Sequence, residues 1–297
     1  MKILFACSEC SPFAASGGLA DVAGSLPAAL QKEGAECRVI MPLYGSIGLQ
    51  WRANMTFLTS FGVPLSWRVA HCGVFTMQYG GVQYYFLDNE QYFKREGGIY
   101  GYFDEAERFA FFSKAVLETL THIDYEPDVI HCNDWQTALI PVYLNVFYRE
   151  VPKLSRTHTV FTIHNIQYQG QFGLDVAGDV CGLPDWAIGK VEFHGDLNMM
   201  KGALEECERI STVAPPMPRR SSTPILAMGW MRSCGRRSGS CAASSMALIP
   251  LATIPPGITP WPPISRRESR RARPCARPPC SSRCACRKNP IPPSWPW

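Results

Sequence analysis

The chain divides into two parts of opposite charge, and this division limits what can fold together as one domain. The first 213 residues carry 15 Lys and Arg against 24 Asp and Glu, a net charge of −9. The other 84 residues carry 14 Lys and Arg and one acid, Glu268, a net charge of +13, which gives +4 for the whole chain. This second part also holds 17 of the 25 prolines and lacks Phe, Tyr and Asp. Because one globular composition does not describe both parts, we place the domain boundary after Val213.

Residues 1–213 alternate between short apolar runs and amphipathic segments. Lys2–Ser8 predicts a buried strand, and a helix with one apolar face follows Gly17-Gly18 as far as Gly34. Between residues 55 and 88, aromatic and β-branched residues alternate around Gly80-Gly81, which predicts an antiparallel hairpin. The other predicted elements are the strands Glu36–Pro42, Asp128–His131, Thr157–Ile163 and Arg209–Val213 and the helices Glu105–Ile123, Trp135–Tyr148 and Asn198–Cys207. This order predicts an α/β fold, with a mostly parallel sheet, helices on both faces and an antiparallel β-hairpin insertion.

Composition and the first residues argue against several classes of protein. The chain has no run of about 18 apolar residues, so a membrane-spanning helix is not expected. Glu9 follows the short apolar start at once, which favours a first strand over a signal peptide. Seven of the 13 cysteines are scattered through the apolar runs of the acidic part, as reduced core thiols would be. We therefore expect a cytoplasmic protein without a membrane partner.

The loop after the first strand, Ser16–Asp21, is a candidate ligand site. In parallel α/β sheets, ligands bind beyond the carboxyl ends of the strands. The two glycines let a ligand approach the backbone closely, and the start of the next helix suits phosphate or a polar sugar. A tight turn that requires positive φ explains the glycines equally well. The loop lacks the G-x-G-x-x-G pattern and no acid ends the second strand, which disfavours a nicotinamide cofactor.

Two later strands also end in polar residues. Asn133 or Asp134 could serve as a helix N-cap, whereas Trp135 and Gln136 beside them are typical sugar-contacting side chains. The run His164–Gln169 places His, Asn, Gln and Tyr directly after a buried strand. Such a run more often lines a site than serves structure alone.

Together these residues resemble the ADP-glucose-dependent bacterial glycogen synthases and plant starch synthases over residues 1 to about 213. The resemblance implies a two-lobed GT-B glucosyltransferase with its active site between two Rossmann-like lobes, of which this chain resembles the N-terminal, acceptor-side lobe. It implies transfer of glucose, with retention, from ADP-glucose to the non-reducing end of an α-1,4-glucan such as glycogen, with no metal or other cofactor. The alternative is a non-catalytic glucan- or nucleotide-binding module. The resemblance is carried by Ser16–Val22, Gly98–Gly101, Glu107–Phe112, His131–Leu139 and Thr162–Gly170.

The resemblance also implies roles for particular residues. It assigns catalysis to His164 and Asp134, with His164 where the family touches the transferring glucose. Such a site must stabilise positive charge at the anomeric carbon, a task suited to fixed dipoles and a carboxylate. Members of the family commonly carry Lys two residues before the Gly-Gly pair, where this chain has Ala15. The implied substrate-binding residues are Ala15, Ser16, Gly17, Gly18, Asp21, Tyr100, Trp135, Gln136, Asn165, Tyr168 and Gln169.

Three interpretations compete for residues 214–297, which we expect to be disordered because they are rich in proline and carry like charges. The basic run Arg266–Arg273 is compatible with an arm that binds nucleic acid. The four cysteines within Cys275–Cys286 could form a metal knuckle, although their spacing fits no usual zinc pattern. The third interpretation is an out-of-frame translation of the family's own continuation.

We favour the out-of-frame interpretation because a one-base shift restores family-like peptides. The codons of Met228–Met231 then become compatible with Gly-Leu-Asp, and those of Pro216–Arg220 with Thr-Tyr-Ala-Glu-Glu. Cys241–Ile249 becomes compatible with a peptide ending in Asn-Gly-Ile-Asp, which opens the family's second lobe. We therefore expect no nucleic-acid partner. We also expect this polypeptide to be inactive, since the Arg, Lys and Glu of the second lobe would be missing.

Overall fold

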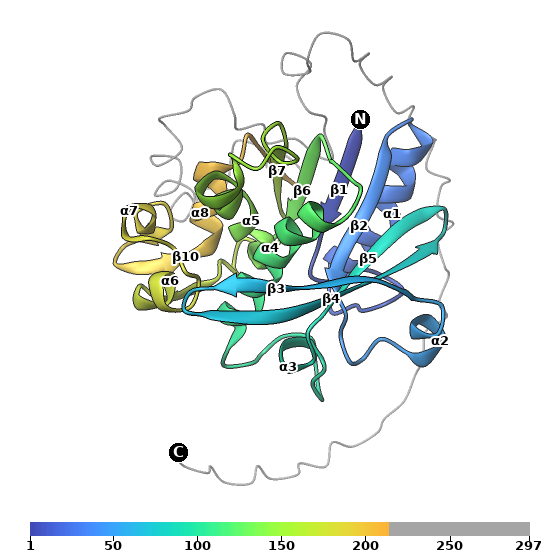
Figure 1. Ribbon diagram of the computed structural model, residues 1–297, viewed down its shortest axis with the longest axis horizontal. Coiled ribbons are helices and arrows are strands. Elements are labelled where there is room, and N and C mark those ends of the chain that lie inside the picture. The colour runs from blue at the N-terminus through green and yellow to red at the C-terminus, as the bar shows by residue number, and fades with distance from the viewer. Residues whose placement is uncertain (214–297) are drawn as a thin grey trace, which may run out of the picture. The chain divides into compact units, whose positions relative to one another are not determined.

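The computed structural model describes residues 1–213, so the predictions for residues 214–297 lie outside the described part. Its centre is an eight-stranded sheet in the order β11–β7–β6–β1–β2–β5–β4–β3 (Figure 1). Neighbours from β11 to β5 pair in parallel, and β5, β4 and β3 pair antiparallel. This arrangement confirms the predicted mostly parallel α/β fold with an antiparallel hairpin. The strands are β1 (Lys2–Ala6), β2 (Glu36–Pro42), β3 (Thr56–Leu65), β4 (Arg68–Tyr79), β5 (Val82–Asp88), β6 (Val129–Asn133), β7 (His158–Ile163) and β11 (Arg209–Thr212).

The predicted hairpin is β4–β5, and it is part of the central sheet. Its turn is Gly80-Gly81, where both residues have positive φ, at 57° and 82°. Glycine adopts this backbone region without steric cost, which explains the pair at the tip. Because β5 also pairs in parallel with β2, the hairpin and β3 widen the sheet instead of forming a separate insertion.

Helices α1 (Gly18–Lys32) and α4 (Glu105–His122) pack against the sheet. Helix α1 contacts β2 and β5, and α4 contacts β3, β4 and β5 as well as α5. The helix predicted over Trp135–Tyr148 is divided into the 3-10 turn η1 (Trp135–Thr137), the helix α5 (Leu139–Tyr143) and the π-helical η2 (Leu144–Tyr148). The remaining helices are α2 (Leu49–Arg52), α3 (Glu90–Phe93), α6 (Asp175–Asp179), α7 (Asp185–Ile188) and α8 (Met199–Glu206).

A second, three-stranded sheet was not predicted. It has the order β8–β10–β9 and lies with α6 and α7 on one side of the described region (Figure 1). Its strands β8 (Gln171–Gly173), β9 (Glu192–Phe193) and β10 (Asp196–Asn198) contain two or three residues each. Strands this short show no alternation of apolar and polar residues that a sequence pattern could reveal.

The core runs through the middle of the central sheet. Ala6, Cys132 and Phe161 lie in register on β1, β6 and β7 and are fully buried. All seven cysteines of residues 1–213 are buried and none of them forms a disulfide, as predicted for core positions. None of the helices described here is long and apolar enough to cross a membrane.

Candidate active site

Three chain segments leave the carboxyl edge of the sheet beside one another. Because β1, β6 and β7 are neighbours, the segments that follow them meet at this edge. We call residues 15–18 the Gly-Gly loop and residues 164–170 the His164 loop. Between them, β6 ends at Asn133 and Asp134. These segments contain the residues that the sequence analysis assigned to catalysis.

Asp134 is a buried carboxylate on a strained backbone. Its φ of 56° and ψ of 179° fall in a backbone region that residues other than glycine rarely occupy. Asp134 occupies the N-cap position of η1, as one interpretation of the sequence suggested, but its side chain makes no capping bond there. Instead, Oδ1 accepts the backbone amides of His164 at 2.8 Å and Asn165 at 3.2 Å. In the described part of the chain, Oδ2 accepts no hydrogen bond, which leaves it available to a ligand.

The environment of Asp134 raises its pKa to about 6. Burial is the main cause, because it disfavours the charged form, and the nearby charge of Glu9 adds to it. The two amide hydrogen bonds act in the opposite direction. The carboxyl group therefore titrates close to neutral pH, as catalytic carboxyl groups often do.

The hydrogen bonds of Asn133 determine the proton position of the neutral His164 ring. Asn133 Nδ2 donates to the carbonyl oxygens of Ala6 at 3.0 Å and His131 at 3.2 Å, so its Oδ1 is an acceptor. His164 Nε2 lies 2.9 Å from this Oδ1 and must be the donor. Burial lowers the pKa of His164 to about 4, so the ring is neutral at pH 7. Its Nδ1 is therefore an unprotonated acceptor.

The Gly-Gly loop is exposed over all four of its residues. Gly17 has an extended backbone with φ −149°, and neither glycine of the pair has positive φ, so the tight-turn interpretation is wrong. A Cβ added to Gly18 would meet nothing within 4 Å. The glycines therefore leave open space above the backbone, as a closely approaching ligand would require. Asp21, in the first turn of α1, is exposed and accepts a hydrogen bond from Ser11 Oγ at 3.3 Å.

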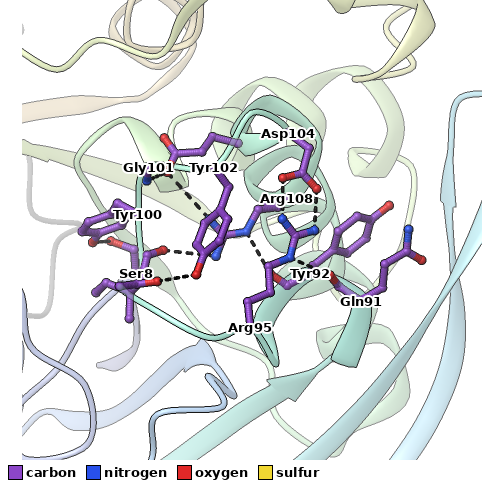
Figure 2. A network of polar contacts seen from close by, with 12 residues as sticks. Ser8, Gln91, Tyr92, Arg95, Tyr100, Gly101, Tyr102, Asp104 and Arg108 are labelled. Atoms are coloured by element: carbon purple, nitrogen blue, oxygen red, sulfur yellow. Dashed lines mark hydrogen bonds and ion pairs between the residues drawn. The ribbon is translucent and has the colours of Figure 1, made fainter. Parts of the chain in front are cut away.

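Tyr100 reaches the end of β1 from a different loop. Its hydroxyl lies 2.7 Å from Ser8 Oγ, and the two side chains point toward each other in Figure 2. Burial raises the pKa of Tyr100 well above its ordinary value, so the phenol stays protonated. The structure therefore brings Tyr100 to the segment that leads into the Gly-Gly loop.

The loop that carries Tyr100 is tied down along its length (Figure 2). Arg108, which is 1% exposed, donates to the carbonyl oxygens of Tyr92 at 2.8 Å and Ile99 at 3.1 Å. Arg95 binds both carboxylate oxygens of Asp104 at 2.6 Å. Paired bonds of this kind fix orientation as well as distance. Tyr100 is therefore held in a fixed position at the sheet edge.

Two of the predicted sugar contacts lie mostly inside the protein. Trp135 is 6% exposed and packs edge-on against Phe109, with ring centroids 5.1 Å apart. In this structure its indole supports the site from within, and a sugar contact stays a prediction. Gln136 is 8% exposed, and its Oε1 has no hydrogen-bond partner within residues 1–213. An unpaired buried amide oxygen is costly, which marks Gln136 as a group that a ligand could satisfy.

The His164 loop presents its later residues to solvent. Tyr168 is 65% exposed, and Asn165 uses its Oδ1 to accept the amide of Gln167 at 3.0 Å. Gln169 is held at the base of the loop, where its Oε1 accepts Asn198 Nδ2 at 2.8 Å. The loop ends at Gly170, which has a φ of +66°. A Cβ on Gly170 would lie 2.6 Å from the Trp135 ring.

The sequence analysis assigned no catalytic or substrate-binding role to Ser8, Glu9 or Asn133, all of which are buried at the sheet edge. Glu9 was the most visible of the three, because an acid inside the run Cys7–Cys10 departs from an otherwise apolar strand end. Each of them makes a hydrogen bond to a residue that the sequence analysis did assign: Ser8 to Tyr100, Glu9 to Ser16 and Gly17, and Asn133 to His164.

The segments at this edge contain acidic but no basic side chains. Residues 7–21, 131–137 and 162–170 include Glu9, Asp21 and Asp134 and no Lys or Arg. No group of three His, Cys, Asp or Glu side chains in the described part could hold a metal ion. The edge is thus better suited to neutral hydroxyl-rich molecules than to phosphate on its own.

Comparison with known proteins identifies the family of the chain. The family model described as the starch synthase catalytic domain matches residues 2–230, which extends 17 residues beyond Val213. A glycogen synthase of Exiguobacterium sibiricum is 49% identical over 219 residues, 72% of this chain and 45% of that protein. A glycogen synthase of Desulforamulus reducens is 47% identical over 216 residues, with the same two coverages. This chain spans about half the length of the curated relatives it matches.

A solved structure extends the similarity to three dimensions. The catalytic domain of starch synthase IV from Arabidopsis thaliana, bound to ADP and acarbose, matches with a TM-score of 0.71 at 26% identity. The match covers 82% of this chain and 50% of that one. The sequence and the fold agree: the chain belongs to the starch synthase catalytic domain family.

Proposed function

We propose that residues 1–213 form the acceptor-side half of a glycogen synthase active site, which transfers glucose from ADP-glucose to an α-1,4-glucan. The observation that carries the proposal is the contact between Asp134, buried on a strained backbone, and the backbone of His164. The relatives named as glycogen synthases, and the related domain bound to ADP and acarbose, support it.

The residues of the site have complementary tasks in this proposal. The neutral His164 ring offers Nδ1 as an acceptor for a sugar hydroxyl, because its Nε2 proton is held by Asn133. Asp134 offers its remaining carboxylate oxygen close to the same loop. As the bond to the leaving phosphate breaks, this carboxylate and the fixed dipoles around it stabilise positive charge at the anomeric carbon.

The donor phosphates need positive charge that this edge does not supply. None of the three segments carries Lys or Arg, and Arg95 and Arg108 are engaged within the Tyr100 loop. The glucan, which is neutral, fits the edge without such help. The proposal therefore concerns the share of the reaction that residues 1–213 carry, since the relatives are about twice as long as the matched region.

Two assays test the proposal. In the first, calorimetry should detect binding of maltoheptaose to the 297-residue chain. In the second, residues 1–213 are fused to the remaining half of the Exiguobacterium sibiricum relative and assayed for transfer of labelled glucose from ADP-glucose to glycogen. We expect transfer by the fusion and its loss in the fusion with His164→Ala. A folded fusion that binds maltoheptaose without transferring glucose would support the alternative, a non-catalytic glucan-binding module.

A cytoplasmic location goes with this proposal. The seven described cysteines are buried and none of them forms a disulfide, a state typical of reducing compartments. Fractionation of cells that express the chain tests this location.

A further inference from the structure

Glu9 is a buried carboxylate whose role the proposed reaction does not explain. The side chain follows β1 and is 5% exposed. Acidic side chains are rarely buried without a partner, because burial removes the charge from water. Its partners are backbone groups: Oε2 accepts the amide of Ser16 at 2.5 Å and that of Gly17 at 3.0 Å. The carboxylate thus holds the amides that lead into α1.

The Gly-Gly loop has little other support. All four of its residues are exposed, and Gly17, the N-cap residue of α1, makes no side-chain capping bond. A Cβ on Gly17 would lie 3.5 Å from Glu9 Oε1, so the loop rests directly on the carboxylate. The position of the open backbone above Gly18 therefore depends on Glu9.

Glu9 also acts on Asp134. Burial is the main cause that raises the pKa of Asp134, the amides of His164 and Asn165 lower it, and the charge of Glu9 adds a smaller increase. The pKa values of Tyr44 and Tyr100 are raised, mainly by burial and also by the charge of Glu9. Both phenols therefore stay neutral. The His164 ring is neutral as well at pH 7. Glu9 is therefore the only charged group that acts on Asp134 within residues 1–213.

We propose that Glu9 is a positioning residue of this site. It fixes the Ser16–Gly17 backbone through the two amides that its Oε2 accepts, and its carboxylate acts electrostatically on Asp134. The choice of an α-1,4-glucan as ligand rests on the proposed function. The effects of Glu9 on the Ser16 and Gly17 amides and on the pKa of Asp134 do not, so they are measured without ligand as well as with it.

The test compares two substitutions in the full 297-residue chain. Glu9→Gln keeps the size of the side chain and removes its charge. Glu208→Gln is the matched control, because Glu208 also accepts a backbone amide, that of Thr159 at 2.6 Å, but directly precedes β11. In Glu9→Gln we expect hydrogen exchange of the Ser16 and Gly17 amides to accelerate by about tenfold or more. In Glu208→Gln these two amides should exchange as in the unmodified chain.

The second readout is the titration of Asp134, followed by NMR of its carboxyl carbon. Its pKa of about 6 should fall in Glu9→Gln, because a like charge has been removed, and stay unchanged in Glu208→Gln. A purely structural role of Glu9 would not move this titration. Unchanged exchange and an unchanged Asp134 titration in a folded Glu9→Gln chain would overturn the proposal.

Ligand binding separates this proposal from the proposed function. We expect the dissociation constant of maltoheptaose to rise roughly tenfold in Glu9→Gln and to stay within about twofold in Glu208→Gln. If the unmodified chain does not bind maltoheptaose, the proposed function fails, while exchange and titration still decide the role of Glu9. If Glu9→Gln does not fold, Glu9→Asp replaces it. In that variant the Ser16 and Gly17 amides should exchange faster, while the pKa of Asp134 stays unchanged. Amides that exchange as slowly as in the unmodified chain would overturn the proposal.

Discussion

The Gly-Gly loop and the His164 loop use the same support for different purposes. Each is held by a buried carboxylate that accepts two successive backbone amides, Glu9 for the first loop and Asp134 for the second. Their glycines differ. An added Cβ on Gly18 would meet open space, whereas on Gly170 it would press into the Trp135 ring. Glycine thus makes room for a ligand in one loop and for the core in the other.

Paired alanine substitutions should expose this difference most strongly. Gly170→Ala should lower the free energy of unfolding by about 3 kcal/mol, because it adds a clash with Trp135 to a φ of +66° that alanine disfavours. Gly18→Ala should change the same free energy by less than about 0.5 kcal/mol, since it lies in the first turn of α1 with free space around it. Urea unfolding of both variants measures the contrast.

Binding should respond in the opposite order. A methyl group at Gly18 enters the space that we assign to a ligand, so Gly18→Ala should weaken maltoheptaose or ADP binding although the fold is intact. Equal destabilisation by the two variants would contradict the comparison. So would unchanged binding of both ligands by Gly18→Ala.

Asp134 stabilises the His164 loop by accepting two of its backbone amides, but its own backbone conformation is strained. Two variants can separate these effects. Asp134→Ala leaves the two amides of the His164 loop without their acceptor and should cost about 2 kcal/mol of unfolding free energy. Asp134→Gly loses the same bonds but relieves the strain at φ 56° and ψ 179°. We therefore expect the glycine variant to be more stable than the alanine variant by about 1 kcal/mol, the reverse of the usual order. Thermal unfolding decides it, and a more stable alanine variant would show that the backbone is not strained.

Acid should destabilise the His164 loop through its neutral ring. The pKa of His164 is lowered to about 4 from an ordinary value of 6.5, so unfolding takes up a proton between these values. The stability from this group is complete above pH 6.5 and is lost as the pH falls toward 4. His131, with a pKa also lowered to about 4, acts in the same direction. Asp134 acts in the opposite direction, because its raised pKa gives stability at low pH that is lost as the pH rises through about 6.

A neutral substitute for His164 isolates its share of this effect. His164→Gln keeps a donor for Asn133 and removes one of the two imidazoles whose pKa is lowered to about 4. Between pH 7 and pH 4.5 the variant should lose about 1 kcal/mol less unfolding free energy than the unmodified chain, a value discounted for the partial exposure of the ring. Chemical unfolding across this range is the measurement, and parallel pH curves for the two chains would refute the assignment.

The elements that sequence alone revealed are those with long, regular patterns. Strand β2 was predicted with its observed bounds, and the helix over Glu105–Ile123 differs from α4 by one residue. The small sheet of β8, β9 and β10 escaped because its strands are too short to show a period. The helix predicted over Trp135–Tyr148 is divided into η1, α5 and η2, and hydrophobic periodicity does not distinguish α-helical from 3-10 or π-helical turns.

The sequence predicted which segments meet at the candidate site, but it did not predict the hydrogen bonds that hold them in place. The polar residues after β6 and β7 pointed to the edge at which the structure brings them together, since neighbouring parallel strands end on the same side. The hydrogen bonds that hold the two loops were not predictable, because they join residues that are distant in sequence. Glu9 accepts amides seven and eight residues away, and Asp134 accepts amides thirty and thirty-one residues away. The preference of Asp for N-caps suggested a local bond for Asp134, and the more distant partners in the fold replaced it.

The weakest effect that we expect concerns the charge of the Gly-Gly loop. Ala15 stands where the family commonly has Lys, and it lies in an exposed loop whose amides are already engaged by Glu9. Ala15→Lys should therefore raise the affinity of the 297-residue chain for ADP by about threefold, because a cation next to the loop attracts the diphosphate and offsets the carboxylate beneath. The gain should shrink as salt is added, since the charge is exposed.

Ala29→Lys is the matched control, because Ala29 is an exposed residue near the other end of α1. It adds the same net charge to the protein without placing it beside the loop. Calorimetry with ADP at low and high salt compares the two variants. A similar gain in both would mean that net charge alone attracts ADP. No gain in Ala15→Lys would mean that Glu9 keeps the diphosphate away from this loop, and the Gly-Gly loop would then meet only the sugar.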